Sequence, residues 1–125
     1  MTVYRIERNN RFSEDHSYGP YQSGRYGDTY QLDRMYDEHS NPCTHPTSWT
    51  DGIIGGHVIA CPSFKLLHQW FSGYLGHLAL NGYKCYAIKL PRRAVVLGKS
   101  GKQCGYIANA VLSRKRISFV TGLPI

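Results

Sequence analysis

Residues 62–71, PSFKLLHQWF, carry the clearest helical pattern in this chain. Phe64, Leu67 and Phe71 recur at i, i+3 and i+7, so an α-helix would place all three side chains on one face. The Pro-Ser pair that begins the stretch suits the first turn of a helix. The pattern therefore predicts an amphipathic helix over 63–71 whose apolar face packs on another element.

Two more helices are expected on either side of this one. The apolar residues of 74–81 again face one way, and an Asn-Gly pair at the end supplies a stop of the left-handed type. Earlier in the chain, Asp28 or Thr29 can cap a short helix that runs to about Glu38. The sequence thus indicates a helix or helix pair at about 63–81, preceded by a shorter helix.

The rest of the chain is typical of strands and turns. Residues 3–8 alternate with period two, as a half-buried strand does. Polar residues and glycines dominate from 9 to 28, which predicts a long ordered loop. Later strands are expected at 57–61, 83–90, 94–98, 103–111 and 117–120, with a hairpin turn at 99–102 and with 113–116 at a sheet end or in a loop.

Length and composition fit one folded domain. The chain has 125 residues, of which 42% are hydrophobic and 18% charged, so it can bury an apolar core. We therefore expect a single α+β domain over residues 1–125. Its parts are a small, mostly antiparallel sheet, one helix or helix pair at about 63–81 packed on it, and the long ordered N-terminal loop.

Charge divides the chain into two unlike parts. Residues 1–51 hold all eight acids and five arginines, whereas residues 52–125 hold ten Lys or Arg and no acid. The acidic part could fold back and neutralise the basic part. Alternatively, basic surface stays exposed and meets a polyanion, because clustered Lys and Arg supply the sequence-independent share of nucleic-acid affinity.

Most of the later positive charge is concentrated in one region. Seven of the ten basic residues after position 51 lie between 92 and 116. They are the candidate contacts with an acidic partner, either nucleic acid or a DNA-mimicking protein: Arg92, Arg93, Lys99, Lys102, Arg114, Lys115 and Arg116. The alternative is that they only solvate a sheet edge, where lysines commonly prevent unwanted strand pairing.

The N-terminal loop is unusually rich in tyrosine. Residues 16–39 hold five tyrosines, and no aliphatic residue precedes Leu32. Tyrosine is flat and amphipathic, so it suits either a lid packed over the sheet or a contact with a protein or nucleobase. Both roles stay open, and Tyr18, Tyr21 and Tyr26 are the candidate binding residues.

Several common sites are not supported by spacing. Gly98-Lys99-Ser100 resembles the end of a phosphate-binding loop, but the glycine required five residues earlier is Arg93 here. Four scattered Cys and His residues lack the close pairing of structural zinc sites, so we expect no metal: Cys43, His45, His57 and Cys61. Cys61 precedes a helix, yet a thiol at the end of a buried strand is more often inert packing than a nucleophile.

The positions of the acidic and apolar residues in the sequence limit the possible enzymatic and membrane roles. Any paired carboxylates must come from residues 1–51, although an enzyme working with Arg5, His45 and Asp51 stays open. No run approaches the roughly 20 apolar residues that cross a bilayer, and the N-terminus has no apolar signal region. We therefore expect a cytoplasmic protein that makes no membrane contact.

A series of short motifs resembles a family of small proteins encoded by bacteriophages and prophages. The motifs are Tyr4-Arg5-Ile6-Glu7, Gly19-Pro20-Tyr21, His45-Pro46, Asp51-Gly52-Ile53, Ser63-Phe64 with Leu67 and Trp70-Phe71, and Val96-x-Gly98 with Gln103. The resemblance extends to about residue 107 and leaves out 113–116. It implies a phage accessory protein acting in the cytoplasm of the bacterial host, in a class where anti-CRISPR and other counter-defence inhibitors are common.

The order of elements is also distantly similar to the ADP-ribosyltransferase core. In that family an aromatic-Arg strand and a Ser-aromatic strand-to-helix junction hold the nicotinamide end of NAD. The residues in matching positions here are Tyr4, Arg5, Ser63 and Phe64, while Gln103 is the polar candidate where those enzymes have a glutamate. Two hypotheses result: a cofactor-free inhibitor that binds a host protein or nucleoprotein complex, and an ADP-ribosyltransferase-like enzyme or NAD-site pseudoenzyme.

Overall fold

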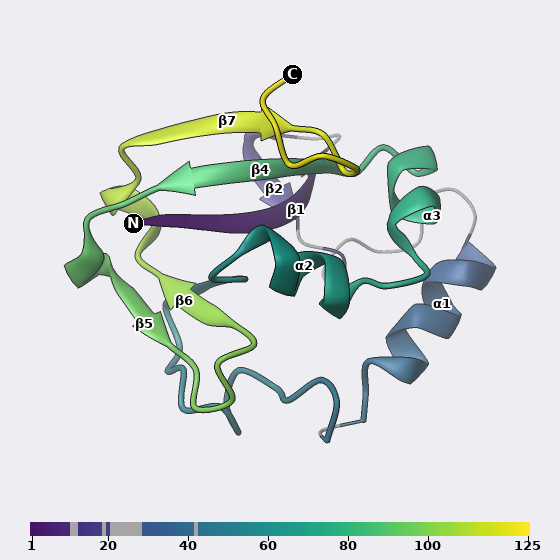
Figure 1. Cartoon of the computed structure of the whole chain (residues 1–125), viewed down its shortest axis with the longest axis horizontal. Helices are drawn as coiled ribbons and strands as arrows, with labels where there is room; N and C mark the ends of the chain where they lie inside the picture. The colour runs from purple at the N-terminus through teal and green to yellow at the C-terminus, as the bar shows by residue number, and fades with distance from the viewer. Residues whose placement is uncertain (11–12, 19, 21–28, 42) are drawn as a thin grey trace.

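The computed structural model describes residues 1–10, 13–18, 20, 29–41 and 43–125, and it has the expected α+β architecture with antiparallel sheets (Figure 1). The strands are β1 (Thr2–Asn10), β2 (Ser13–Tyr18), β3 (Val58–Ala60), β4 (Lys84–Lys89), β5 (Val95–Leu97), β6 (Cys104–Tyr106) and β7 (Ser113–Ile117). The helices are α1 (Thr29–Glu38), α2 (Phe64–Trp70) and α3 (Leu75–Leu80), with 3-10 turns η1 (Arg92–Ala94) and η2 (Ala108–Ala110).

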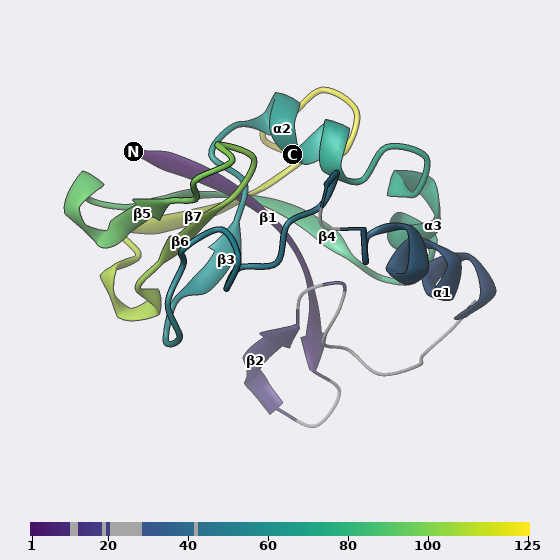
Figure 2. The same ribbon diagram turned by 90° about the horizontal axis from the view of Figure 1, so that it is seen from below.

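The strands form two sheets rather than one. Four strands pair in the order β2-β1-β4-β7, and three pair in the order β3-β6-β5. The sheets are joined where Tyr4 of β1 and Cys61, just after β3, exchange two backbone hydrogen bonds of 2.8 Å. Figure 2 shows the three-stranded sheet at one end of the molecule and α1 with α3 at the other.

The cross-strand register gives the four-stranded sheet two different faces. Ile6 lies opposite Cys85, which lies opposite Ile117, and this row packs with Leu67 and Phe71 on the helical side. Residues directly opposite share a face, while neighbours along a strand point to opposite faces. Val3, three positions before Ile6, and Ile88 opposite it therefore lie on the other face, which packs against the three-stranded sheet.

The central helix confirms the strongest sequence pattern. Ser63 is the N-cap of α2, and its Oγ accepts a hydrogen bond of 3.1 Å from the Leu66 N–H. Leu67 and Phe71 are buried, whereas Phe64 is half-buried. The following helix α3 and the earlier helix α1 also lie where they are expected, and Gly82 has the positive φ of +84° that ends α3.

Two expectations about strands are wrong. The long loop over 9–28 is a strand in part, because β1 continues to Asn10 and returns as β2. Near the C-terminus, 113–116 was expected in a loop or at a sheet end, followed by a strand at 117–120. Instead, 113–116 forms most of β7, and Ile117 is the only residue of 117–120 that belongs to this strand. β2 and β7 are edge strands paired through their backbones, so polar side chains are tolerated and no apolar alternation marks them.

The strand expected over 103–111 is also shorter than predicted. β6 covers only Cys104–Tyr106, and η2 then turns the chain toward β7. Gly105 is buried between Ile53 and His57, at a place where an added Cβ would lie 2.6 Å from an Ile53 methyl carbon. The segment that contains Ile53 therefore packs directly against the backbone of the three-stranded sheet.

Candidate binding surface

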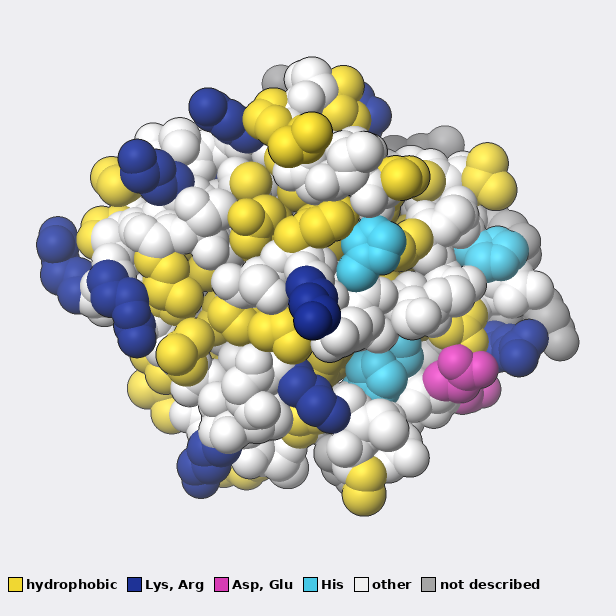
Figure 3. Space-filling view, in the orientation of Figure 1, with side chains coloured by type: hydrophobic (Ala, Val, Ile, Leu, Met, Phe, Trp, Pro, Cys, Tyr) yellow, Lys and Arg dark blue, Asp and Glu magenta, His cyan; other side chains and the backbone are white. Residues whose placement is uncertain are grey.

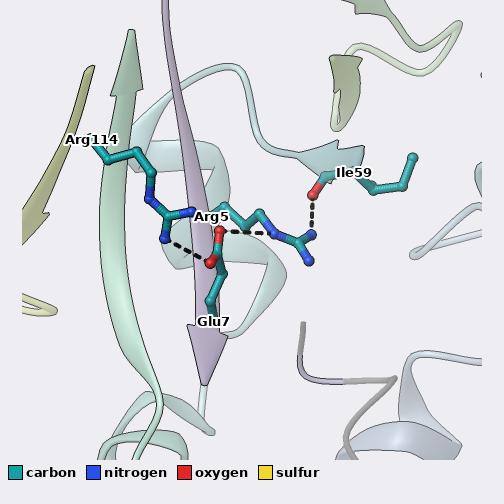
Figure 4. Close-up of polar contacts among 4 residues, drawn as sticks. All are labelled: Arg5, Glu7, Ile59 and Arg114. Atoms are coloured by element: carbon teal, nitrogen blue, oxygen red, sulfur yellow. Dashed lines mark hydrogen bonds and ion pairs between the residues drawn. The ribbon is translucent and has the colours of Figure 1, made fainter. Parts of the chain in front are cut away.

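A buried carboxylate lies between two arginines on the face of the four-stranded sheet that turns toward the three-stranded sheet. Glu7 is 2% exposed and pairs with Arg5 through Nε at 3.2 Å and with Arg114 through Nη2 at 2.7 Å. Figure 4 shows the two guanidinium groups approaching the Glu7 carboxylate from opposite sides. One negative charge therefore fixes two positive charges that lie 109 positions apart in the chain.

Arg5 has a structural role in this cluster. Its side chain is only 11% exposed, and Nη1 donates a hydrogen bond of 2.6 Å to the Ile59 carbonyl of β3. The guanidinium thus ties β1 to the neighbouring sheet while Glu7 neutralises it. With its donors directed at protein oxygens and its surface covered, Arg5 is poorly placed to bind an external anion.

Arg114 is held just as firmly but remains accessible. Its guanidinium carbon lies 4.5 Å from the centroid of the Tyr86 ring, a cation-π distance, and its side chain is 39% exposed. Partial burial lowers the pKa of Arg114, but the hydrogen bond and charge of Glu7 outweigh burial and leave that pKa raised. Arg114 is therefore a fixed, permanently charged donor at the surface.

Two further basic residues share this face. Arg116 lies opposite Tyr86, Lys84 lies opposite Glu7, and both are exposed. Lys115 lies opposite Ala87, so it belongs to the helical face instead. We call Lys84, Arg114 and Arg116 the basic face; together with Arg5 they set four positive charges against the one carboxylate of Glu7 on this side of β1, β4 and β7.

The other predicted basic contacts lie elsewhere. Arg92 and Arg93 are on η1, where Arg92 donates to the Val95 carbonyl at 3.2 Å. Lys99 and Lys102 are in the β5-β6 hairpin turn, and Lys102 Nζ donates to the Thr44 carbonyl at 3.1 Å. Figure 3 shows the Lys and Arg side chains of one face in separate groups rather than in one continuous patch.

The comparisons with known proteins identify a family. The profile described as "Bacteriophage T4 Y00F protein" matches residues 1–120. The chain belongs to this bacteriophage family. The match confirms the expected relation to a small phage protein family and supports a phage accessory protein. No curated protein and no solved structure matches the chain.

The Y00F match also corrects the extent of the sequence resemblance. The motifs were expected to stop at about residue 107, but the family match continues through β7 to residue 120. The strand that carries Arg114 and Arg116 is therefore part of the family fold rather than an added tail. None of the helices described has the length and apolar character needed to span a bilayer.

The tyrosines predicted to bind a partner are only partly placed in this Y00F-family chain. Tyr18 ends β2, and its Cα pairs with that of Arg8 on β1. Tyr21 and Tyr26 lie outside the described residues. Their part in binding remains a sequence-based prediction.

The residues that match the ADP-ribosyltransferase pattern are brought together only in part: Tyr4 meets Phe64, while Arg5 lies on the opposite face. Tyr4 and Arg5 point to opposite faces of β1; the Tyr4 ring lies edge-on to Phe64, with centroids 6.0 Å apart, on the helical side. Ser63 is used as a helix cap. Gln103 is buried and donates from Nε2 to the Pro46 carbonyl at 2.9 Å. NAD binding stays an untested prediction.

Three of the cysteines and His45 have packing roles, whereas Cys43 is an exposed free thiol. Cys61, Cys85 and Cys104 are buried free thiols; burial raises the pKa of Cys85 and Cys104 to about 12 and raises that of Cys61 as well. His45 stacks on His39 with ring centroids 3.9 Å apart, and its Nε2 lies 3.0 Å from the Trp70 carbonyl oxygen. Such thiols are poor nucleophiles because the thiolate is strongly disfavoured.

Sequence reasoning missed the residues that organise the basic face. Glu7 and Tyr86 determine the position of Arg114, yet neither was singled out as a site residue. The alternation of 3–8 does place Arg5 and Glu7 on one face of a strand, which is a usable signal. The pairing with Arg114 is visible only once the order of strands is known.

Proposed function

We propose that this phage protein is a counter-defence inhibitor that acts by binding rather than by catalysis. Its target is a host defence or nucleoprotein complex, and its contact surface is the basic face, Lys84, Arg114 and Arg116. The assignment as a phage accessory protein rests on the phage family. The proposed binding role and target rest on the chemistry of the three basic side chains.

The observation that carries the proposal is the fixed geometry of Arg114. A flexible surface arginine loses side-chain entropy when it binds, whereas a guanidinium already held by Glu7 at 2.7 Å and by the Tyr86 ring at 4.5 Å loses little. Guanidinium groups match the geometry of phosphate and carboxylate oxygens. A preformed donor of this kind favours a polyanionic surface as the partner.

The local charge balance supports the same conclusion. Glu7 is shared between Arg5 and Arg114, so it cannot also neutralise Arg116. No acid occurs anywhere after Asp51 in the sequence. Among the side chains that the structure describes, the basic face therefore keeps a net positive charge, which would also speed the approach to a negatively charged target.

Affinity capture from bacterial lysate, with and without nuclease, tests the proposal directly. Arg116→Glu reverses one exposed charge on the basic face, and Lys115→Glu makes the same change one residue away on the opposite face. We expect the wild type and Lys115→Glu to retain a common partner that Arg116→Glu loses. Equal capture by both variants would remove the basic face from the contact.

Nuclease treatment then distinguishes the kinds of target. Loss of the partner after nuclease indicates that nucleic acid is part of the contact, whereas retention indicates an acidic protein surface. Arg114 itself is a poor choice for charge reversal, because the change would place a second carboxylate beside the buried Glu7. The Lys115 and Arg116 pair avoids this problem, since both side chains are exposed.

A further inference from the structure

Trp49 is presented to solvent on a closely hydrogen-bonded turn. Its side chain is 81% exposed, although Trp is usually one of the more buried residue types. The Trp49 carbonyl accepts from the Gly52 N–H at 3.1 Å, and the Thr47 carbonyl accepts from the Asp51 N–H at 3.0 Å. The Thr47 and Thr50 hydroxyl groups lie 2.9 Å apart within the same turn. The backbone that carries the indole is therefore fixed.

The turn is also anchored to the β5-β6 hairpin. Asp51 is 3% exposed, and its two carboxylate oxygens accept from the Ser100 N–H at 2.6 Å and the Ser100 hydroxyl at 2.8 Å. The Asp51 carbonyl accepts from the Lys99 N–H at 2.9 Å. Because this acid is fully used inside the protein, it leaves no negative charge at the surface beside Trp49.

Two lysine side chains contact the segment that carries the indole. The stem of Lys99 crosses the turn so closely that a Cβ added at Gly52 would lie 3.0 Å from Lys99 Cε. Lys102 reaches the Thr44 carbonyl just before the turn. An exposed aromatic ring on a hydrogen-bonded turn, with Lys99 against Gly52 and Lys102 bonded to Thr44, combines a stacking surface with partners for phosphate groups.

We propose that Trp49, Lys99 and Lys102 form a binding site for single-stranded nucleic acid, in which a base stacks on the indole and the adjacent phosphates meet the two lysines. The site is separate from the basic face, and it does not depend on the function proposed above. Asp51, the acid two residues from Trp49, is buried and hydrogen-bonded to Ser100, so the two lysines favour an anionic ligand. The indole favours a ligand with an unpaired planar ring over a duplex, whose bases are already stacked.

The test is fluorescence anisotropy with a labelled oligothymidylate of about eight nucleotides, beside an abasic oligonucleotide of the same length. The variants are Trp49→Ala, Trp49→Phe, and Leu80→Ala as the control, since Leu80 is 86% exposed on α3. We expect Trp49→Ala to weaken oligothymidylate binding roughly tenfold or more, with Trp49→Phe and Leu80→Ala close to the wild type. The abasic strand should bind weakly and equally to all four proteins.

A charge variant tests the lysine part separately. Lys99→Gln should make the log-log salt dependence of oligothymidylate binding shallower by about one unit. The proposal is overturned if Trp49→Ala binds the oligonucleotide as the wild type does, or if the wild type does not bind it at all. Either of those results would indicate instead that Trp49 inserts into an apolar pocket of a partner protein. The loss of affinity caused by Trp49→Ala should be the same in the wild type and in Arg116→Glu, so this site and the basic face can fail independently.

Discussion

At the scale of single residues, the basic face depends on Glu7. This carboxylate is 2% exposed and holds Arg5 on one side and Arg114 on the other. Two charge-assisted hydrogen bonds compensate for its desolvation, and the arginines in turn are oriented by it. A residue that would never contact the partner therefore controls the geometry of those that do.

Replacing Glu7 with Gln should destabilise the fold by about 3 kcal/mol, because two arginines lose their countercharge in a partly buried site. Urea unfolding followed by circular dichroism measures the change. Glu38→Gln is the comparison: the pair of Glu38 with Arg34 is exposed on both sides, and a glutamine oxygen can still accept the hydrogen bond from Tyr74, so a clearly smaller loss of stability is expected. Similar losses in the two variants would contradict the structural role assigned to Glu7.

His39 provides a second prediction at this scale. Burial, and then the charge of the neighbouring His45, lower the pKa of His39 from its ordinary value of 6.5 to about 4. In this range the unfolded chain binds a proton that the folded chain does not, so unfolding becomes easier as the pH falls from 6.5 toward 4. The protonation of His39 therefore costs no stability above pH 6.5, and the free energy of unfolding decreases progressively below that pH.

Unfolding free energies measured between pH 7 and 5 test this dependence, with about 1.4 kcal/mol per pH unit as the upper limit for one group. Among the described residues, the rings and charged groups around His39 include those of His45, Trp70, Phe71, Tyr74 and Glu38. Replacing His39 with Gln should flatten the pH dependence in this window. An unchanged slope in that variant would assign the dependence to other groups.

At the scale of elements, α2 shows why a short helix can be predicted with success. Its apolar spacing, its Ser63 cap and its burial against β1 all point to the same structure. Seven residues would not be a stable helix in isolation, so most of the stability comes from packing. The buried side chain just after the helix, Phe71, is therefore a sensitive position.

Truncation of Phe71 to Ala should cost about 3–5 kcal/mol, because a 5%-exposed aromatic ring would leave a cavity between α2 and the sheet. Thermal and urea unfolding give the value. Leu80→Ala shortens a side chain that is 86% exposed on the next helix and should change stability by less than about 0.5 kcal/mol. A cost for Phe71→Ala as small as that of Leu80→Ala would contradict the packing of α2.

The edge strands show where sequence patterns stop being informative. Central strands such as β4 bury alternate residues, so Cys85 and Ile88 produce a recognisable pattern. β7 pairs on one side along most of its length and carries Arg114, Lys115 and Arg116, whose charges resist further pairing. β7 is a strand because its backbone pairs with β4, and its side chains show no apolar alternation from which this pairing could be predicted.

At the scale of the whole molecule, the sequence indicated the fold class but not the division into two sheets. Composition and periodicity predict how many apolar segments there are, while the order of strands depends on contacts between distant residues. Arg5 and Arg114 illustrate the difference: both were noticed in the sequence, for separate reasons, and only the sheet order brings them to one carboxylate. The same holds for Asp51 and Ser100, which fix the turn that carries Trp49.

The charge imbalance of the sequence is resolved in part by the fold. Glu7 and Asp51 are the acids buried within the described residues, and both are used for internal hydrogen bonds. Their charges therefore organise basic segments rather than cover them. Outside, the described residues carry separate positive groups and the exposed acids of α1, and the basic face is the positive group with a preformed guanidinium.

The most direct test of the central claim is the salt dependence of binding to a polyanion through the basic face. Fluorescence anisotropy with labelled duplex DNA and duplex RNA, at several salt concentrations, compares the wild type with Arg116→Glu and Lys115→Glu. We expect affinity to fall steeply with salt, and Arg116→Glu alone to weaken binding and to make the log-log slope shallower by about one unit or more. Equal affinities and slopes for Arg116→Glu and Lys115→Glu would contradict the basic face as the binding surface.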